Sequence, residues 1–339
     1  MPDRPRPPKR ATKPAGAVVG PVDARQIPRY AGLGTFARLP QSGEVKKADI
    51  AILGVPFDAG TTYRPGARFG PQAIRQASRL LRPYDPALDT EPWNSQQVVD
   101  SGDVGANPFS IPEALAAIER DIARLLAAGT RVVTLGGDHT ITLGALRAIH
   151  DHFGPVSLVH FDAHLDTWDT YFGASITHGS FLRRAAEEGL FLERASTHVG
   201  IRGPLYGRRD LVEDADLGFR IVHCVELDSI GVGGAVDRIR KRTKSHPLYL
   251  SIDIDVLDPA HAPGTGTPEV GGLSTRELLA LVEGLSGLNV VGADVVEVAP
   301  SYDHAEITSL AAATVAYKLL SLLAVSRAAR ASGGRRNPR

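Results

Sequence analysis

Four short apolar segments of this chain are followed by acidic or histidine side chains of the kinds that bind metal ions. In chain order these side chains are His139, Asp162, His164, Asp166, Asp253, Asp255 and Glu297. If the segments are neighbouring strands of a parallel sheet, the side chains meet at one edge, because ligands bind at the carboxyl ends of such strands. Several half-buried carboxylates that face one point need a cation there, because burying an unpaired carboxylate costs much free energy.

The spacing within the clusters indicates how many cations are present. Asp162, His164 and Asp166 occupy every second position of their segment, and Asp253 and Asp255 are likewise two positions apart. Alternate residues of an extended chain point the same way, so each cluster can direct its ligands at one point. Aspartates and histidines without cysteine favour Mn²⁺ over a single structural Zn²⁺. Together with His139, these five aspartates and histidines offer more ligands than one catalytic metal needs. This predicts two metals that share carboxylates and a water.

Segments rich in β-branched residues alternate along the chain with segments that have the periodicity of an α-helix. These elements position the ligands. We expect strands within 48–57, 130–137, 155–163, 197–203, 219–227, 247–255 and 288–298. We expect helices at 111–128, 141–151, 179–189, 233–243, 274–286 and 305–325. Alternating strands and helices predict an α/β fold with three α-β-α layers and a mostly parallel central sheet. Cys224, in the run FRIVHCVEL, is expected to be a buried strand residue.

Composition and charge bound the class of protein. The chain has 339 residues, 43% of them hydrophobic and 22% charged, which is typical of a globular protein and excludes a disordered one. The formal net charge is zero because basic ends offset an acidic body. We expect a basic, Pro-rich and partly disordered arm at 1–29, a single domain at 30–325 and a flexible basic tail at 326–339. No membrane segment or secretion signal is expected, and the single cysteine excludes an internal disulfide.

The motifs resemble those of the ureohydrolases, the family that includes arginase and agmatinase. The matching segments are GGDHT (136–140), HFDAHLDTWD (160–169), SIDIDVLDPAHAPGTGTPEVGGL (251–273) and ADVVEVAPSYD (293–303). The segment GVPFDAGTTYRPGARFGPQAIR (54–75) is similar to the agmatinase branch rather than to arginase. The resemblance covers about residues 30–325 and implies an arginase-like fold.

The resemblance also implies a role for each site residue. One Mn²⁺ would be held by His139, Asp162, Asp166 and Asp253, and the second by Asp162, His164, Asp253 and Asp255. Water shared by the two metals would attack a guanidinium carbon and give urea and a primary amine, with Asp166 assisting proton transfer. Glu297 would bind the guanidinium, whose planar fork matches a carboxylate. His178 would pass a proton to the leaving amine, which suits a group that titrates near neutral pH.

The residues leave the choice of guanidino compound open. The stretch after the DAHLD motif does not match the amino-acid loop of arginases, which disfavours arginine. Agmatine ends in an ammonium, to which Trp168, Asp169 and Tyr171 could offer aromatic faces and a carboxylate. Guanidinobutyrate ends in a carboxylate, for which Arg202 or Arg208 is a candidate. We expect agmatine hydrolysis to putrescine, with guanidinobutyrase as the alternative; His261 is read as a pocket-wall residue of unknown effect.

Two alternative functions are weighed against hydrolysis of a guanidino compound, and the partners of the protein are predicted as well. A metal-dependent deacetylase of the same fold is disfavoured by the paired-metal set and Glu297. A non-catalytic homologue is disfavoured because every matched ligand position is filled. The resemblance implies a homo-oligomer, either a hexamer or a trimer. We expect a small guanidino substrate, no nucleic-acid partner and a cytoplasmic location.

Overall fold

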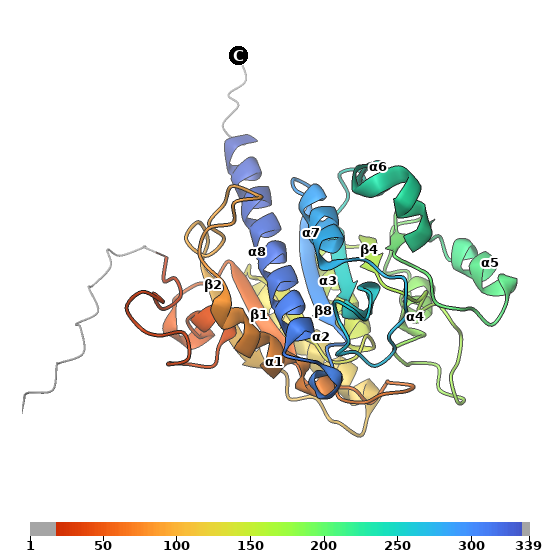
Figure 1. Cartoon of the computed structure of the whole chain (residues 1–339), viewed down its shortest axis with the longest axis horizontal. Helices are drawn as coiled ribbons and strands as arrows, with labels where there is room; N and C mark the ends of the chain where they lie inside the picture. The colour runs from red at the N-terminus through yellow and green to blue at the C-terminus, as the bar shows by residue number, and fades with distance from the viewer. Residues whose placement is uncertain (1–17, 334–339) are drawn as a thin grey trace, which may run out of the picture.

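The computed structural model describes residues 18–333, with side chains described to residue 326. Its centre is an eight-stranded sheet in which each neighbouring pair of strands is parallel, in the order β2-β1-β3-β8-β7-β4-β5-β6 (Figure 1). The strands are β1 (Ile50–Val55), β2 (Val98–Asp103), β3 (Arg131–Gly136), β4 (Ser157–Phe161), β5 (Thr197–Val199), β6 (Ile221–Val222), β7 (Leu248–Asp253) and β8 (Val290–Val296). The four strands that precede the predicted ligands, β3, β8, β7 and β4, are consecutive in this order.

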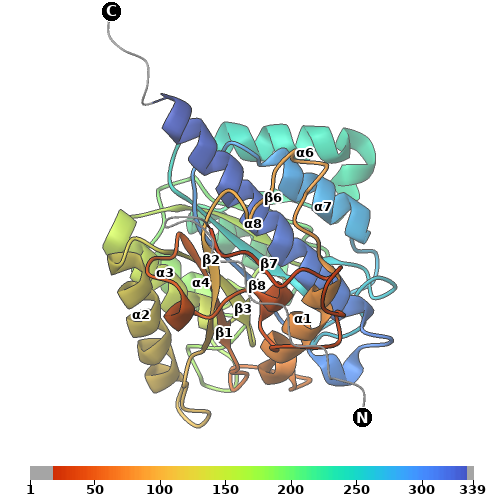
Figure 2. The same cartoon turned by 90° about the vertical axis from the view of Figure 1, so that its left-hand side faces the viewer.

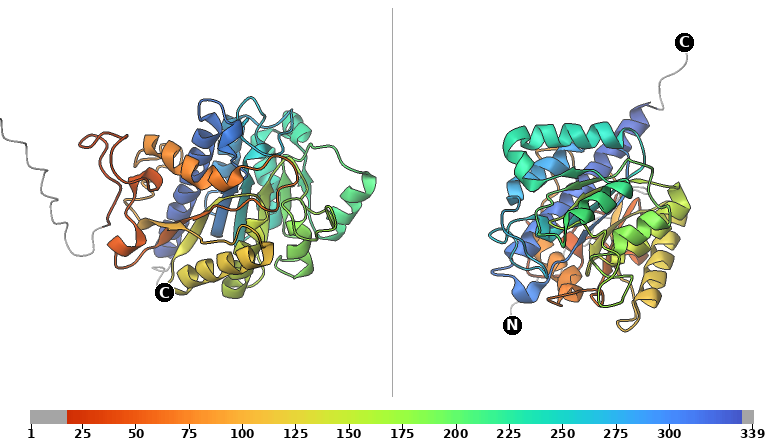
Figure 3. Two further views of the ribbon diagram at one scale, coloured as in Figure 1. Left: turned by 90° about the horizontal axis from the view of Figure 1, so that it is seen from below. Right: turned by 90° about the vertical axis from the view of Figure 1, so that its right-hand side faces the viewer.

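Helices cover both faces of the sheet, as Figure 2 shows. One layer holds α2 (Ile111–Ala127), α3 (Ile141–Phe153) and α4 (Phe181–Glu187). The other holds α1 (Gly70–Ala77), α6 (Leu227–Thr243), α7 (Thr275–Gly284) and α8 (Ile307–Gly333). A short helix, α5 (Arg208–Asp216), lies at the end of the molecule opposite the described N-terminal segment (Figure 3). The three-layer arrangement confirms the predicted fold class.

The sheet separates two apolar cores, which explains why its strands are apolar along their whole length. In β7, Leu250 belongs to the core beneath α6, α7 and α8, whereas the neighbouring Tyr249 belongs to the core beneath α2 and α3. Val290 and Val291 of β8 divide between the cores in the same way. Because successive side chains point to opposite faces, a strand covered on both sides needs apolar residues at every position.

Helix α8 owes its strongly apolar composition to burial inside the fold. Its segment Ile307–Ser326 is long and apolar enough to cross a membrane by length and composition alone, with a mean hydropathy of 1.6. In the structure, however, 83% of that stretch is buried, and the helix packs along β8 and against α1 and α7 (Figure 1). An apolar helix of this kind is typical of the core of an α/β domain.

Three elements and one residue differ from the expectations. Strand β2 and helices α1 and α5 were not predicted, because VVDSGD and RRDLVEDAD are polar and α1 is short and starts at Gly70-Pro71. The prediction that Cys224 is a buried strand residue is wrong. Strand β6 ends at Val222, and Cys224 is half-buried in a 3₁₀ turn, where its Sγ lies 3.2 Å from the carbonyl oxygen of Gly271.

The described N-terminal segment is packed onto the domain. The guanidinium of Arg38 donates hydrogen bonds to the carbonyls of Val22, Ile27 and Pro28, within the segment predicted to be an arm. Helix α8 continues to Gly333, past the expected start of the tail at residue 326. The remainder of both basic ends, residues 1–17 and 334–339, lies outside the described residues, and the domain boundaries stay a prediction.

Candidate metal centre

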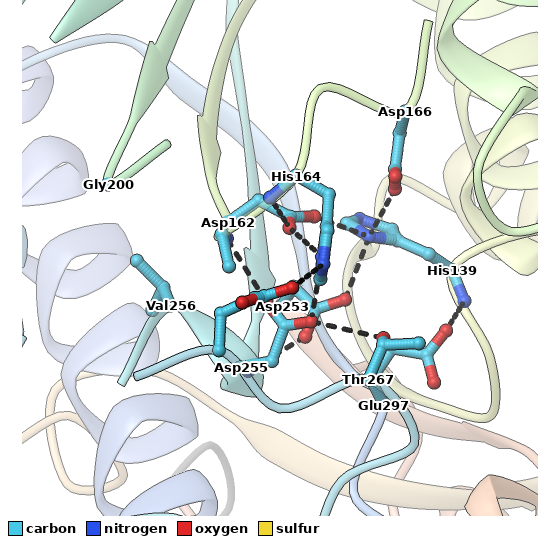
Figure 4. A network of polar contacts seen from close by, with 12 residues as sticks. His139, Asp162, His164, Asp166, Gly200, Asp253, Asp255, Val256, Thr267 and Glu297 are labelled. Carbon is cyan, nitrogen blue, oxygen red and sulfur yellow. Dashed lines mark hydrogen bonds and ion pairs between the residues drawn. The ribbon is translucent and has the colours of Figure 1, made fainter. Parts of the chain in front are cut away.

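The predicted ligands come together at the carboxyl edge of the central strands (Figure 4). His139 follows β3, Asp253 closes β7, and the segment after β4 supplies Asp162, His164 and Asp166. The residues His139, Asp162, Asp166 and Asp253 are all buried, each at most 5% exposed. Strands that are consecutive in the sheet therefore bring together residues more than a hundred positions apart in the chain.

One group of ligands is centred on the imidazole of His139. Its Nδ1 atom lies 3.2 Å from an Oδ2 atom of each of Asp162, Asp166 and Asp253. Neither this Nδ1 nor Asp162 Oδ2 has a hydrogen-bond partner in the described structure, although both are buried. Buried polar atoms normally have partners. Two unpartnered buried atoms that lie together with carboxylate oxygens of Asp166 and Asp253 are what a cation would satisfy.

The other nitrogen of His139 determines which form of the ring is present. His139 Nε2 lies 2.8 Å from Ser251 Oγ, whose hydroxyl donates to Asp294 Oδ1 at 2.7 Å. Because the serine hydrogen is used for Asp294, the serine oxygen accepts the hydrogen on Nε2. In the neutral ring, Nδ1 therefore has its lone pair directed at the point where the three carboxylates meet. Such an outer hydrogen bond is how proteins orient a histidine that binds metal.

A second group of ligands shares Asp162 with the first. His164 Nδ1 lies 3.3 Å from Asp162 Oδ1 and 3.1 Å from Asp255 Oδ2. Asp162 thus uses Oδ2 toward the first group and Oδ1 toward the second, which is the arrangement of a bridging carboxylate. The second oxygen of Asp253, Oδ1, instead accepts the backbone amide hydrogen of Asp255 at 2.8 Å. Bridging by Asp253 therefore stays a prediction.

The backbone that aims these side chains is not the extended chain that the spacing suggested. Asp166 has a φ of +56°, so a left-handed turn directs its carboxylate back toward His139. Asp255 lies in a 3₁₀ turn, and the side chain of Asp253 accepts the hydrogen bond that begins this turn. The residues converge as predicted, but through tight turns rather than through alternation along a strand.

Electrostatics explains why the cluster needs positive charge. Burial, together with the nearby Asp162, raises the pKa of Asp166 to about 6. Burial and the neighbouring carboxylates also hold the pKa of Asp253 well above its ordinary value and raise that of Asp255. Carboxylates in such surroundings ionise fully only when a cation offsets their charge. The set of aspartate oxygens and histidine nitrogens, without cysteine, fits divalent cations such as Mn²⁺.

Glu297 lies next to the metal ligands and keeps one oxygen free. Its Oε1 accepts the backbone amide hydrogen of His139 at 2.8 Å and lies 2.9 Å from Nδ1 of His178. Its Oε2 is buried and has no hydrogen-bond partner in the described structure. A left-handed backbone at Glu297, with φ +64°, turns this side chain inward after the end of β8. The free oxygen can accept hydrogens from a planar guanidinium.

His178 has a partner at both nitrogens in either protonation state. Nδ1 donates to Glu297, while Nε2 lies 3.0 Å from the Thr62 amide nitrogen and 2.7 Å from Thr62 Oγ1. A neutral ring accepts the amide hydrogen at Nε2, and a protonated ring donates to the hydroxyl. Burial opposes the charged ring, but Glu297 and nearby aspartates prevail and raise the pKa of His178 to about 9. A residue that is satisfied in both states can take up and release a proton.

The model of the arginase family matches residues 48–321 of the chain. The chain belongs to the arginase family. It is 44% identical to putative agmatinase 1 of Schizosaccharomyces pombe, over 87% of this chain and 83% of that protein. It is also 44% identical to a guanidinopropionase of Pseudomonas aeruginosa, over 91% and 97%. The structure of proclavaminate amidinohydrolase from Streptomyces clavuligerus superimposes with a TM-score of 0.84 at 41% identity, over 88% of this chain and 99% of that one.

This arginase-family chain has a cavity of about 370 Å³ directly over the metal ligands. The cavity is lined by Thr62, His164, Asp166, Trp168, Tyr171, His178, Gly179, Pro204, Leu205, Tyr206, Asp253 and Thr267. The predicted Trp168 and Tyr171 are among these residues. Asp169 is not, because its carboxylate forms an ion pair with Arg184 on α4. The third candidate for the substrate tail is therefore directed away from the cavity.

Several residues of the cavity wall were not predicted from the sequence, among them Tyr206 and Thr62, and three further residues expected near the substrate do not line the cavity. Tyr206 and Thr62 had no periodic pattern to mark them, although Thr62 lies in the agmatinase-type segment 54–75. Arg202 does not line the cavity; its guanidinium donates to backbone carbonyls, including those of Asp255 and Glu269 in the loop after β7.

Arg208 and His261 also lie away from this cavity. Arg208 is an exposed residue at the start of α5. His261 lines a separate, open cavity between α7 and α8, so the interpretation of His261 as part of the substrate pocket wall is not supported.

Proposed function

We propose that this ureohydrolase cleaves agmatine to putrescine and urea. The observation that supports this choice most is the composition of the cavity over the metal ligands. Three aromatic rings line it, and no lysine or arginine is among the described residues of its wall. A substrate tail that ends in an ammonium finds aromatic faces there, whereas a tail that ends in a carboxylate finds no lysine or arginine to pair with.

The three rings lie close enough to act on one tail. The ring centroid of Trp168 is 5.8 Å from that of Tyr171 and 5.8 Å from that of Tyr206, with steep angles between the planes. Tyr171 and Tyr206 are 6.3 Å apart. Cations bind over aromatic faces with roughly 0.5–2 kcal/mol per favourable contact, more when water is excluded. The cluster therefore favours a cationic tail within this cavity.

Each group of site residues would have a separate role in the reaction. His139, Asp162, His164, Asp166, Asp253 and Asp255 would hold two Mn²⁺ ions, which supply a water of lowered pKa when bound. Glu297 would orient the guanidinium through its free Oε2 atom. Asp166, at the boundary between the metal group and the cavity, would hold the proton of the attacking water. His178 would deliver a proton from its Nε2 side to the leaving amine.

Hydrolysis of a guanidino acid, such as guanidinobutyrate, is the second candidate. It is favoured by the guanidinopropionase of Pseudomonas aeruginosa, which is as similar in sequence as the putative agmatinase. The engagement of Arg202 with backbone carbonyls argues against it, because this residue was one of the two candidate partners for a substrate carboxylate.

A comparison of substrates separates the two candidates. Urea release by the manganese-loaded protein would be measured with agmatine, arginine, 4-guanidinobutyrate and 3-guanidinopropionate. We expect the largest kcat/KM with agmatine. A larger value with either guanidino acid would overturn the choice of substrate while leaving the ureohydrolase assignment intact.

We also propose that the protein is a homo-oligomer, either a hexamer or a trimer, in the cytoplasm. Several large apolar side chains are strongly exposed on the single chain, among them Tyr30, Phe109 and Phe172. Assembly into an oligomer would cover apolar side chains of this kind where they lie in a contiguous patch. Light scattering of the full chain would give the mass, and a monomer would contradict the proposal.

A further inference from the structure

Helix α5 supplies no residue of the metal centre, yet two of its carboxylates are directed at the segment that does. Asp210 and Asp214 are four residues apart, so they lie on the same face of the helix. That face contacts the segment after β4 that contains Asp166, Trp168 and Tyr171. Asp214 is only 1% exposed, which is unusual for an aspartate on a polar surface helix.

Asp214 is connected to the metal ligands in two directions. Its Oδ1 accepts the hydroxyl hydrogen of Thr167 at 2.9 Å, and Thr167 directly follows the ligand Asp166. The same Oδ1 lies 3.1 Å from Nε2 of His198 on β5. One buried oxygen thus contacts both the turn that aims Asp166 and a neighbouring strand of the sheet.

From His198 the contacts continue to the bridging ligand. His198 Nδ1 lies 2.8 Å from His160 Nδ1, and His160 Nε2 lies 2.9 Å from Asp162 Oδ2. Both imidazoles are completely buried. Because rings in a packed interior cannot reorient freely, this row of buried rings limits the positions open to Asp162.

Asp210 makes the corresponding contacts to the aromatic cluster. Its Oδ2 accepts the indole hydrogen of Trp168 at 3.2 Å and the backbone amide hydrogen of Tyr206 at 2.9 Å. It also accepts the amide hydrogen of Gly207 at 3.3 Å, at the start of the helix. Two of the three rings that would receive the substrate tail are therefore held by one carboxylate.

We propose that α5 is the positioning element of the site, with Asp214 setting the metal ligands and Asp210 setting the rings for the substrate tail. Neither residue touches the reacting atoms, so both are positioning residues. The Asp214 half of the inference concerns the chain's own metal ligands. The Asp210 half rests on the proposed function, because it assigns the rings to a cationic tail.

The Asp214 half is tested with Asp214→Asn and, as a milder change, Thr167→Val, which removes only the hydroxyl. Asp216→Asn, an exposed aspartate on the same helix, is the matched control. Loss of such an outer contact weakens metal binding by roughly 10–100-fold, so we expect weaker Mn²⁺ affinity by calorimetry in both variants. Hydrogen–deuterium exchange of residues 166–178 should become faster, while the control matches the parent in both measurements.

Unchanged Mn²⁺ affinity and unchanged exchange in both variants would overturn this half, whatever the enzyme's substrate. The Thr167→Val variant keeps the test valid if Asp214→Asn does not fold. If exchange and affinity change as expected but no guanidino compound yields urea, the proposed function fails and the positioning role stands.

The Asp210 half is tested with Trp168→Phe, which keeps an aromatic ring but removes the indole hydrogen, and with Asp210→Ala. Misplaced binding groups should raise KM for agmatine by about tenfold with kcat within about twofold. KM for an alkylguanidine without the terminal amine should not change. An equal loss with both substrates, or no change with agmatine, would overturn the assignment of Asp210.

Discussion

The backbone amide of His139 donates its hydrogen to Oε1 of Glu297 at 2.8 Å, which joins the metal centre directly to the carboxylate expected to bind the guanidinium. His139 presents Nδ1 to three carboxylates on its other side. The position of a bound guanidinium is therefore set relative to the metals by a single hydrogen bond. Such a short connection provides the orientation that a hydrolysis of this kind requires.

The first prediction concerns Glu297→Gln. Glutamine can still accept the His139 hydrogen, but its amide group replaces the free oxygen and repels a guanidinium. We expect kcat/KM to fall by about 100-fold or more, as when one oriented charge partner is lost, while Mn²⁺ content is unchanged. Enzyme kinetics and elemental analysis of the same preparation measure both. A variant with parental turnover would show that Glu297 does not bind the substrate.

The second prediction concerns Asp255→Ala. Asp255 faces His164 at 3.1 Å in the second group of ligands, so its loss should abolish activity and lower the bound Mn²⁺ below that of the parent. Asp151→Ala, which removes an exposed aspartate of α3, is the control and should keep both. Full activity and full metal content in Asp255→Ala would rule out the two-metal assignment.

The third prediction follows from the raised pKa of His178, about 9 in the folded protein against 6.5 for the free side chain. A raised folded pKa means that the folded state binds the proton more tightly. The stabilisation is fully present below pH about 6.5 and is lost as the pH rises toward about 9. Metal-free protein should therefore lose more stability between these two pH values than the His178→Gln variant does. Equal losses in urea denaturation would contradict this.

The fourth prediction concerns the stability of the fold rather than the site. Lys318 of α8 lies 2.7 Å from Asp85 and 2.7 Å from Glu283 of α7, and the Asp85 side chain is fully buried. Breaking a buried ion pair leaves an uncompensated charge and costs about 3–5 kcal/mol. Lys318→Met should lose that amount in chemical denaturation. Adding Asp85→Asn should restore part of it, and no recovery would mean that packing rather than charge is responsible.

The metal ligands could be predicted from the sequence because their positions depend on one regular feature, the alignment of parallel strand ends. The order of the strands, by contrast, is set by packing between distant residues, so the pairing of β3 with β8 and of β7 with β4 could not be predicted from local pattern. Strand β2 was missed because its aspartates are matched by Arg75, a partner that only the fold reveals.

The residues of the cavity wall were harder to predict from the sequence than the metal ligands beneath the cavity. Thr62 and Tyr206 come from loops, whose conformation depends on contacts with other segments rather than on periodicity. Asp169 was a reasonable candidate for a cationic tail, but Arg184, fifteen residues further along the chain, pairs with it instead. The same-face spacing of Asp210 and Asp214 was visible in the sequence, yet it had no meaning until α5 was known to be a helix.

The most direct test of the account is a titration of metal-free protein with Mn²⁺ while urea release from agmatine is followed. We predict no urea without metal, and a rate that increases until two equivalents per chain are bound, with putrescine formed in equal amount. Absence of urea at every metal loading, with agmatine and with the guanidino acids, would contradict the central claim that this centre hydrolyses guanidino compounds.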